Sequence, residues 1–164
     1  MKYTLKLILG ILIISQSCEQ KQTETTLYLV RHAEKDTLFE GDNPPLIQAG
    51  YTRAEQLKEL LKNEGIEQIY STKFTRNINT VNPLLSTLNL DVKIYDYYGF
   101  HPTLDSIKAS TKTTLLCGHG DNLLPIIAHL KGQPPYESLG HNEYDNLFKL
   151  TILSDTSLVE VIKF

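Results

Sequence analysis

The segment Thr26–Lys35 constrains the fold most, because its short apolar run ends abruptly in basic side chains. The run Leu27–Val30 has the length and composition of a buried strand, and Arg31 and His32 follow it directly. In open α/β sheets, ligands bind outside the carboxyl ends of the strands. The segment therefore predicts a strand whose end presents Arg31 and His32 to a ligand; a strand end with solvated charges is the alternative.

Strand-length apolar runs alternate with helical stripes along the rest of the chain. Helices are predicted at Leu46–Asn63, Thr75–Leu88, Leu104–Ser110 and Leu123–Leu130. Further strands are predicted at Glu67–Tyr70, Asp91–Tyr95, Thr113–Cys117, Leu147–Leu153 and Leu158–Phe164. This alternation predicts an α/β fold of three layers, in which helices cover both faces of a mixed, mostly parallel sheet. The last two strands are predicted to form its antiparallel edge.

Length and charge narrow the possible functions. The chain has 164 residues, of which 41% are hydrophobic, and this suffices for one domain with an ordinary core. The formal net charge is −3 and no segment gathers basic side chains, so we expect no nucleic-acid partner. An anionic ligand must then be held by local cations. Cys117 lies in an apolar run and is predicted to be a core residue rather than a disulfide partner.

The first residues have the pattern of an export signal. Lys2 and Lys6 precede the apolar run Leu7–Ile14. This run is too short to span a bilayer core, which needs about 20 residues. We therefore predict a signal peptide at residues 1–17.

Residues 18–25 are polar and predict a flexible tether before a single domain at residues 26–164. Cys18 resembles the lipid-attachment site of bacterial lipoproteins, where the cysteine becomes the acylated first residue of the mature protein. This resemblance implies an exported protein, anchored to a membrane by lipid and facing the periplasm or the exterior of a bacterial cell. A signal cut nearby, with Cys18 left free, is the alternative.

Basic side chains stand at or near the ends of three predicted strands. Arg31 and His32 follow the first strand, Arg76 comes shortly after the second, and His119 follows the strand that ends at Cys117. Parallel neighbouring strands would bring these side chains into one crevice. Two guanidinium groups bind phosphate oxygens bidentately, and a histidine attacks phosphorus when one ring nitrogen is fixed by a hydrogen bond. The set therefore favours phosphoryl chemistry.

Three motifs occur in the order that one known family shows. They are Arg31-His32-Ala33 after the first strand, the stretch Ser71–Thr80 with its central Arg76, and the turn Gly118-His119-Gly120. With these motifs the chain resembles the histidine phosphatase superfamily, which has the phosphoglycerate mutase-like fold. The resemblance runs from about Thr26 to the C-terminus.

The resemblance implies a role for each motif residue. His32 would be the nucleophile that becomes phosphohistidine, Arg31 and Arg76 would be phosphate ligands, and His119 would stabilise the transferred phosphoryl group. It further implies a small phosphoester substrate, a phosphomonoester hydrolase reaction, and neither a metal nor another cofactor.

The carboxyl group that serves as general acid is less closely specified. One branch of the superfamily carries a glutamate after the third strand, where this chain has Asp96. Another branch carries an aspartate directly after the second histidine, whereas Gly120 here separates His119 from Asp121. We expect Asp96 to be the general acid; a solvated loop carboxylate, Asp121 in its place, or no acid are the alternatives. The aromatic loop Tyr95–Phe100 is expected either to border the leaving group or to join the core.

Other readings use the same residues differently. A phosphate-binding lipoprotein without turnover would hold its ligand by Arg31, Arg76 and His119. A mutase is disfavoured because the loops around the site are short. A metal site would consist of His32, His119, Glu34 and Asp121. It is disfavoured because the two arginines would repel the metal.

Four further residues are given structural roles only. Glu34 and Lys35 are expected to pair with each other or to cap their loop. His101, His129 and His141 have no motif around them and are predicted to be surface or packing residues.

Overall fold

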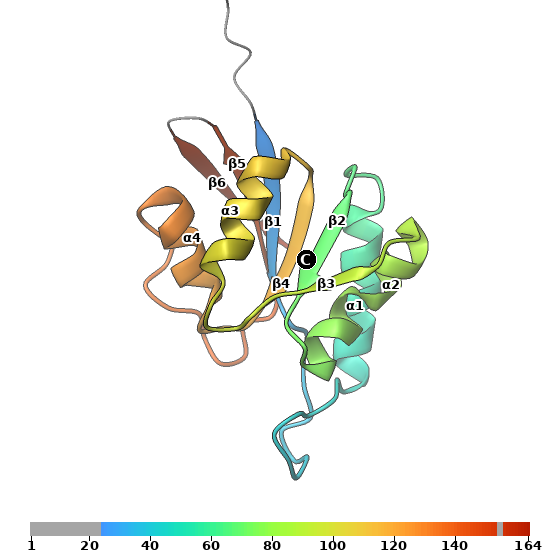
Figure 1. Cartoon of the computed structure of the whole chain (residues 1–164). Coiled ribbons are helices and arrows are strands. Elements are labelled where there is room, and N and C mark those ends of the chain that lie inside the picture. The colour runs from blue at the N-terminus through green and yellow to red at the C-terminus, as the bar shows by residue number, and fades with distance from the viewer. Residues whose placement is uncertain (1–23, 154–155) are drawn as a thin grey trace, which may run out of the picture.

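One six-stranded sheet and four helices make up the regular structure of residues 24–153 and 156–164, which the structure describes (Figure 1). The computed structural model has strands β1 (Thr25–Arg31), β2 (Gln68–Ser71), β3 (Val92–Ile94), β4 (Thr114–Gly118), β5 (Asn146–Ile152) and β6 (Ser157–Lys163). Its helices are α1 (Gln48–Leu61), α2 (Thr75–Leu88), α3 (His101–Ser110) and α4 (Leu123–Lys131). The predicted signal peptide and Cys18 lie outside the described residues.

The strands are ordered β3-β2-β4-β1-β5-β6 across the sheet. Strands β3, β2, β4 and β1 are parallel to one another, while β5 pairs antiparallel with both β1 and β6. The prediction of a mixed, mostly parallel sheet with an antiparallel edge is therefore confirmed.

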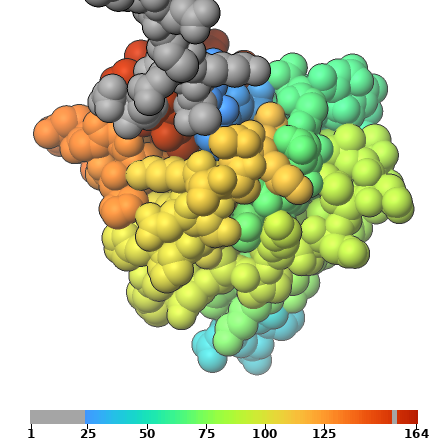
Figure 2. All heavy atoms as spheres, turned by 45° about the horizontal axis from the view of Figure 1, so that its top comes forward, coloured from blue at the N-terminus to red at the C-terminus, as the bar shows by residue number. Residues whose placement is uncertain are grey.

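Alternate side chains of the central strands face opposite helical layers. Leu29 and Leu116 pack with residues of α3 and α4, whereas Val30 and Leu115 pack with residues of α1 and α2. Figure 1 shows the two helix pairs on opposite sides of the sheet, and Figure 2 shows the side chains of α3, in yellow, covering one side. The predicted three-layer arrangement is confirmed. Cys117 is fully buried, as expected of a core residue, and burial raises its pKa to about 12.

The register of the central strands brings the predicted site residues to one edge of the sheet. Arg31 of β1 is paired with Gly118 of β4, so His32 and His119 leave neighbouring strands at the same level. Strand β2 pairs with β4 in the same direction, which carries the start of α2, with Arg76, to this edge.

Two helices begin elsewhere than the sequence predicts. Helix α1 begins at Gln48, because the preceding Leu46 forms an isolated bridge with Lys35. Helix α3 begins at His101, three residues earlier than expected, since Pro102 fits in a first helical turn, where its missing N–H is not needed.

Strand β1 already includes Thr25, which the sequence assigns to the tether. Along the described part of the chain, no helix combines the length and the hydrophobicity that a membrane crossing requires.

Candidate active site

Hydrogen bonds from α2 hold the ends of β1 and β4 together. The amide of Asn77 donates to the carbonyl oxygen of Gly118 at 2.8 Å, and the backbone N–H of His32 donates to the same oxygen at 3.0 Å. The N–H of Ala33 donates to the hydroxyl of Thr80 at 2.9 Å. Helix α2 therefore fixes the position of the loop that carries His32.

The His32 ring is buried and has a defined tautomer. Its Nδ1 lies 2.8 Å from the carbonyl oxygen of Ala33, which can only accept, so Nδ1 carries the proton and Nε2 the lone pair. Burial, opposed by the bond to Ala33 and aided by the nearby His119, Arg76 and Arg31, lowers the pKa of His32 to about 3. The ring is neutral at physiological pH, and its Nε2 is available as a nucleophile.

His119 lies beside His32 and is held at both ring nitrogens. The two ring centroids are 5.3 Å apart. Nδ1 of His119 lies 3.4 Å from Nη2 of Arg76, which can only donate, so Nε2 carries the proton and donates to the Thr72 hydroxyl at 2.9 Å. Burial, reinforced by Arg76, lowers the pKa of His119 to about 4. The site thus contains two neutral imidazoles.

Arg31 is positioned by the loop that precedes β5. Its Nη1 donates to the carbonyl oxygens of Gly140 at 3.0 Å and Glu143 at 3.1 Å, and its Cζ lies 4.3 Å from the ring centroid of Tyr144. On its other side, a Cβ at Gly120 would come within 3.1 Å of Cζ. A side chain at position 120 would therefore crowd this guanidinium, which would have to move by a few tenths of an ångström.

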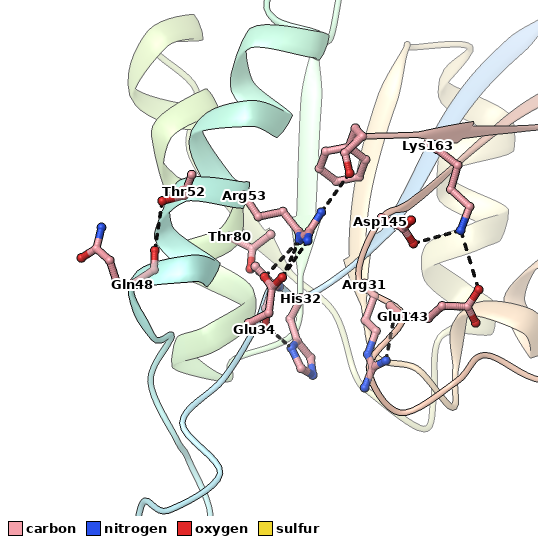
Figure 3. Close-up of polar contacts among 12 residues, drawn as sticks. Arg31, His32, Glu34, Gln48, Thr52, Arg53, Thr80, Glu143, Asp145 and Lys163 are labelled. Atoms are coloured by element: carbon pink, nitrogen blue, oxygen red, sulfur yellow. Dashed lines mark hydrogen bonds and ion pairs between the residues drawn. The ribbon is translucent and has the colours of Figure 1, made fainter.

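Both site arginines keep buried N–H groups without a hydrogen-bond partner. These are Nε of Arg31 and both Nε and Nη1 of Arg76. Over the described residues, neither guanidinium forms an ion pair with a carboxylate. An unsatisfied buried donor costs about 1–3 kcal/mol, so a bound anion that accepts these bonds would be strongly favoured. Figure 3 shows that Arg31 and His32 extend in the same direction from the end of β1.

The structure brings together Arg31, His32, Arg76 and His119, which line one cavity of about 580 Å³. Two residues that the sequence did not indicate complete its surroundings: Thr72 beside His119 and Tyr144 against Arg31. Tyr97, with its ring centroid 4.7 Å from that of His119, comes from the aromatic loop expected either to border the leaving group or to join the core. Thr72 directly follows β2, and this strand-end position is the signal that could have found it. Tyr144 lies in a loop where no motif marks it.

The three histidines predicted to be structural differ in position. All are exposed, and the rings of His101 and His129 contact each other with centroids 4.6 Å apart. His141, in contrast, lines the cavity that contains His32. His141 is thus a surface residue, as expected, that also lies at the cavity.

Asp96 does not reach this cavity. It lines a neighbouring cavity, where its Oδ1 accepts hydrogen bonds from the N–H groups of Tyr98 at 2.9 Å and Gly99 at 3.3 Å. These bonds hold the pKa of Asp96 below its usual range. The geometry therefore favours an ionised, turn-forming carboxylate over a proton donor.

Asp121, in contrast, lines the cavity with His32. The hydroxyl of Tyr97, which also lines this cavity, donates a hydrogen bond to its Oδ2. Burial and this bond raise the pKa of Tyr97, so the phenol stays protonated. Asp121 is thus the aspartate that the structure places beside the two histidines.

Glu34 pairs with Arg53 of α1, not with Lys35 as expected. Arg53 Nη2 lies 2.7 Å from Oε1 of Glu34, and its Nη1 donates to the carbonyl oxygen of Phe164 (Figure 3). Helix α1 contacts the same loop closely, because a Cβ at Gly50 would come within 2.3 Å of the Glu34 carbonyl oxygen. Glu34 is therefore engaged in holding the loop after His32. In residues 24–153 and 156–164, no cluster of three or more His, Cys, Asp or Glu side chains could hold a metal ion.

Comparison with known families agrees with this site. Residues 27–97 match the family described as "Histidine phosphatase superfamily (branch 1)". This match agrees with the predicted superfamily over fewer than half of the residues. The matched segment contains His32, Arg31 and Arg76 of the histidine phosphatase motifs, and His119 lies beyond it. No curated protein matches the chain.

Solved structures share the histidine phosphatase fold at low sequence identity. The protein histidine phosphatase SixA complexed with tungstate is 17% identical with a TM-score of 0.69, over 85% of this chain and 97% of that one. The α-ribazole phosphatase from Shigella flexneri is 16% identical with a TM-score of 0.68, over 85% and 96%. A mycobacterial glucosyl-3-phosphoglycerate phosphatase is 14% identical with a TM-score of 0.67, over 85% and 99%. These similarities establish the fold.

Proposed function

We propose that the protein is a phosphomonoester hydrolase that works through a phosphohistidine on His32. The observation that carries this proposal is the buried, neutral His32 ring, whose Nδ1 is fixed by the Ala33 carbonyl while two guanidinium groups with unpartnered donors stand beside it. The superfamily match over residues 27–97 supports phosphatase activity in general.

In the first step, Nε2 of His32 attacks the phosphorus and the bond from phosphorus to the leaving oxygen breaks. Arg31 and Arg76 bind the equatorial oxygens, where charge is spread in the transition state. His119 is neutral and its one N–H is engaged by Thr72, so we propose that it supports the transferred group by positioning Arg76, whose Nη2 lies 3.4 Å from its Nδ1. The leaving oxygen gains a proton.

We propose Asp121 as the group that delivers this proton, in place of Asp96. Asp121 lines the cavity with His32, whereas Asp96 lines the neighbouring one. In the second step, the Asp121 carboxylate takes a proton from water as the water oxygen attacks phosphorus. The bond from phosphorus to Nε2 then breaks, and inorganic phosphate is released.

We further propose that Cys18 is acylated and that the domain is exported. β1 runs from Thr25 to Arg31, so the chain enters the sheet at the end opposite the site, which would leave the cavity free in an anchored protein. Incorporation of labelled fatty acid into the full chain, lost in Cys18→Ser, would support this; equal labelling of both proteins would contradict it.

Acid-labile phosphate labelling tests the central proposal. With p-nitrophenyl phosphate, we expect turnover and a label that is stable in base and lost in acid. His32→Ala should lose both, while His129→Ala, on the surface of α4, should retain both. A label that survives His32→Ala would assign the nucleophile elsewhere. Binding of phosphate without any turnover would favour the phosphate-binding alternative.

A further inference from the structure

A second cavity of about 730 Å³ adjoins the site, and Arg76 is the one residue of its lining to which the proposed reaction gives a role. Arg76 and Tyr97 line both cavities, so the two spaces meet across these two side chains. The second cavity lies at the end of the edge strand β3. A group attached to a phosphate held by Arg76 can therefore extend into it.

The shared wall of this second cavity is aromatic. The guanidinium of Arg76 lies over Phe74, with Cζ 4.4 Å from the ring centroid. Tyr97 contacts the edges of two rings, with its centroid 6.4 Å from that of Phe74 and 4.5 Å from that of Tyr98. Rings therefore continue without interruption from the site outward.

Part of this wall is apolar surface left open to water. Tyr98 is 85% exposed and Ile94 is 54% exposed, and both line the cavity. Large apolar side chains gathered at the rim of a cavity are typical of ligand sites, because a ligand removes their surface from water.

The backbone that carries the exposed Tyr98 ring is nevertheless held in place. The two hydrogen bonds to Oδ1 of Asp96 fix the turn through Tyr98, and the amide of Asn122 lies 3.4 Å from the carbonyl oxygen of Tyr97. A wall that is fixed before the ligand arrives loses little conformational freedom on binding. Asp96 is thus a positioning residue for the aromatic wall.

We infer that this cavity binds an aromatic ring of the alcohol part of the substrate, so that the substrates are phosphomonoesters of ring-bearing alcohols. The inference rests on the proposed hydrolase reaction. Offset or edge-to-face contact with Phe74, Tyr97 and Tyr98 supplies the recognition of the ring.

A matched pair of esters tests the inference: 3-phenylpropyl phosphate and propyl phosphate. Both release primary alcohols of similar acidity, so a difference in kcat/KM reports binding of the ring rather than leaving-group chemistry. For the wild-type protein we expect the phenyl ester to be favoured roughly 10-fold to 100-fold. Equal kcat/KM values for the two esters would overturn the inference.

Variants at the rim of the second cavity test whether the preference for the phenyl ester arises there. Tyr98→Ala and Ile94→Ala should each lower the preference several-fold, through a lower kcat/KM for the phenyl ester. Leu158→Ala is the matched control, because Leu158 is 62% exposed on β6, at the opposite edge of the sheet. A preference that persists in the double variant Tyr98→Ala/Ile94→Ala would place the ring elsewhere.

Binding of the non-hydrolysable 3-phenylpropylphosphonate and propylphosphonate, measured by calorimetry, separates this inference from the proposed function. Tighter binding of the phenyl compound without turnover of either ester would contradict the hydrolase proposal and retain the aromatic site. Turnover of both esters, with equal affinities for the two phosphonates, would retain the hydrolase proposal and contradict the aromatic site.

Discussion

The inner strands and the edge strand end at the same side of the sheet but present different environments. His32 and His119, which follow β1 and β4, are 3% and 4% exposed, whereas Tyr98, which follows β3, is 85% exposed. Each inner strand has neighbours on both sides, and α2 ties their ends together. The chemistry that needs a neutral, fixed imidazole therefore lies at the inner strands, and the edge strand carries the open surface suited to the variable part of a substrate.

The largest expected effect is at the inner strands. His32→Ala should lower kcat by about 10⁴-fold or more, because no other group forms the covalent intermediate. Stopped assays of p-nitrophenyl phosphate hydrolysis, with folding checked by circular dichroism, measure it. Activity within 10-fold of the wild type would contradict the role of His32.

The second largest effect is expected from replacing Arg76, whose guanidinium lines both cavities. Arg76→Lys should lower kcat/KM by roughly 10²-fold to 10³-fold, because a lysine keeps the charge but loses the bidentate contact. Arg53→Lys, which alters an arginine outside the cavity, is the control and should have a much smaller effect. A similar loss in both variants would indicate a structural rather than a phosphate-binding role.

The two aspartates allow a direct comparison of the inner and edge regions. Asp121→Asn should lower kcat for propyl phosphate by about 10²-fold and for p-nitrophenyl phosphate by less, since a nitrophenolate leaves without a proton donor. Asp96→Asn should change kcat for propyl phosphate by less than about 5-fold and act mainly on the preference for the phenyl ester. The opposite order of effects would restore Asp96 as the general acid.

Protonation of the buried histidines should be visible in stability. Because the pKa values of His32 and His119 are lowered from 6.5 to about 3 and about 4, the unfolded chain binds more protons below pH 6.5. The contribution of each histidine to the free energy of unfolding is therefore at its maximum above that pH. It decreases as the pH falls, by roughly 2–3 kcal/mol per histidine at about pH 4.5. Urea unfolding between these pH values should show a shallower loss in His119→Asn than in the wild type. Equal losses in the two proteins would contradict the burial of a neutral His119.

The sequence predicts which strand ends meet, but not how side chains in the following loops are directed, for a physical reason. Parallel register places strand ends at one level, so Arg31 and His119 could be brought together from strand boundaries alone. The direction of the Asp96 side chain depends on a local turn, and the partner of Glu34 depends on how α1 packs. Neither feature has a periodicity in the sequence.

The contact of Gly50 with the Glu34 carbonyl gives helix α1 an unexpected influence on the chemistry. A hydrogen atom is the largest substituent that this position accepts, so one added methyl group would push the helix away from the loop or the loop toward the cavity. Because this loop begins at His32, the displacement would turn the proposed nucleophile away from its line of attack. A substitution at Gly50, on an outer helix and away from the cavity, would thereby abolish activity while the fold is retained.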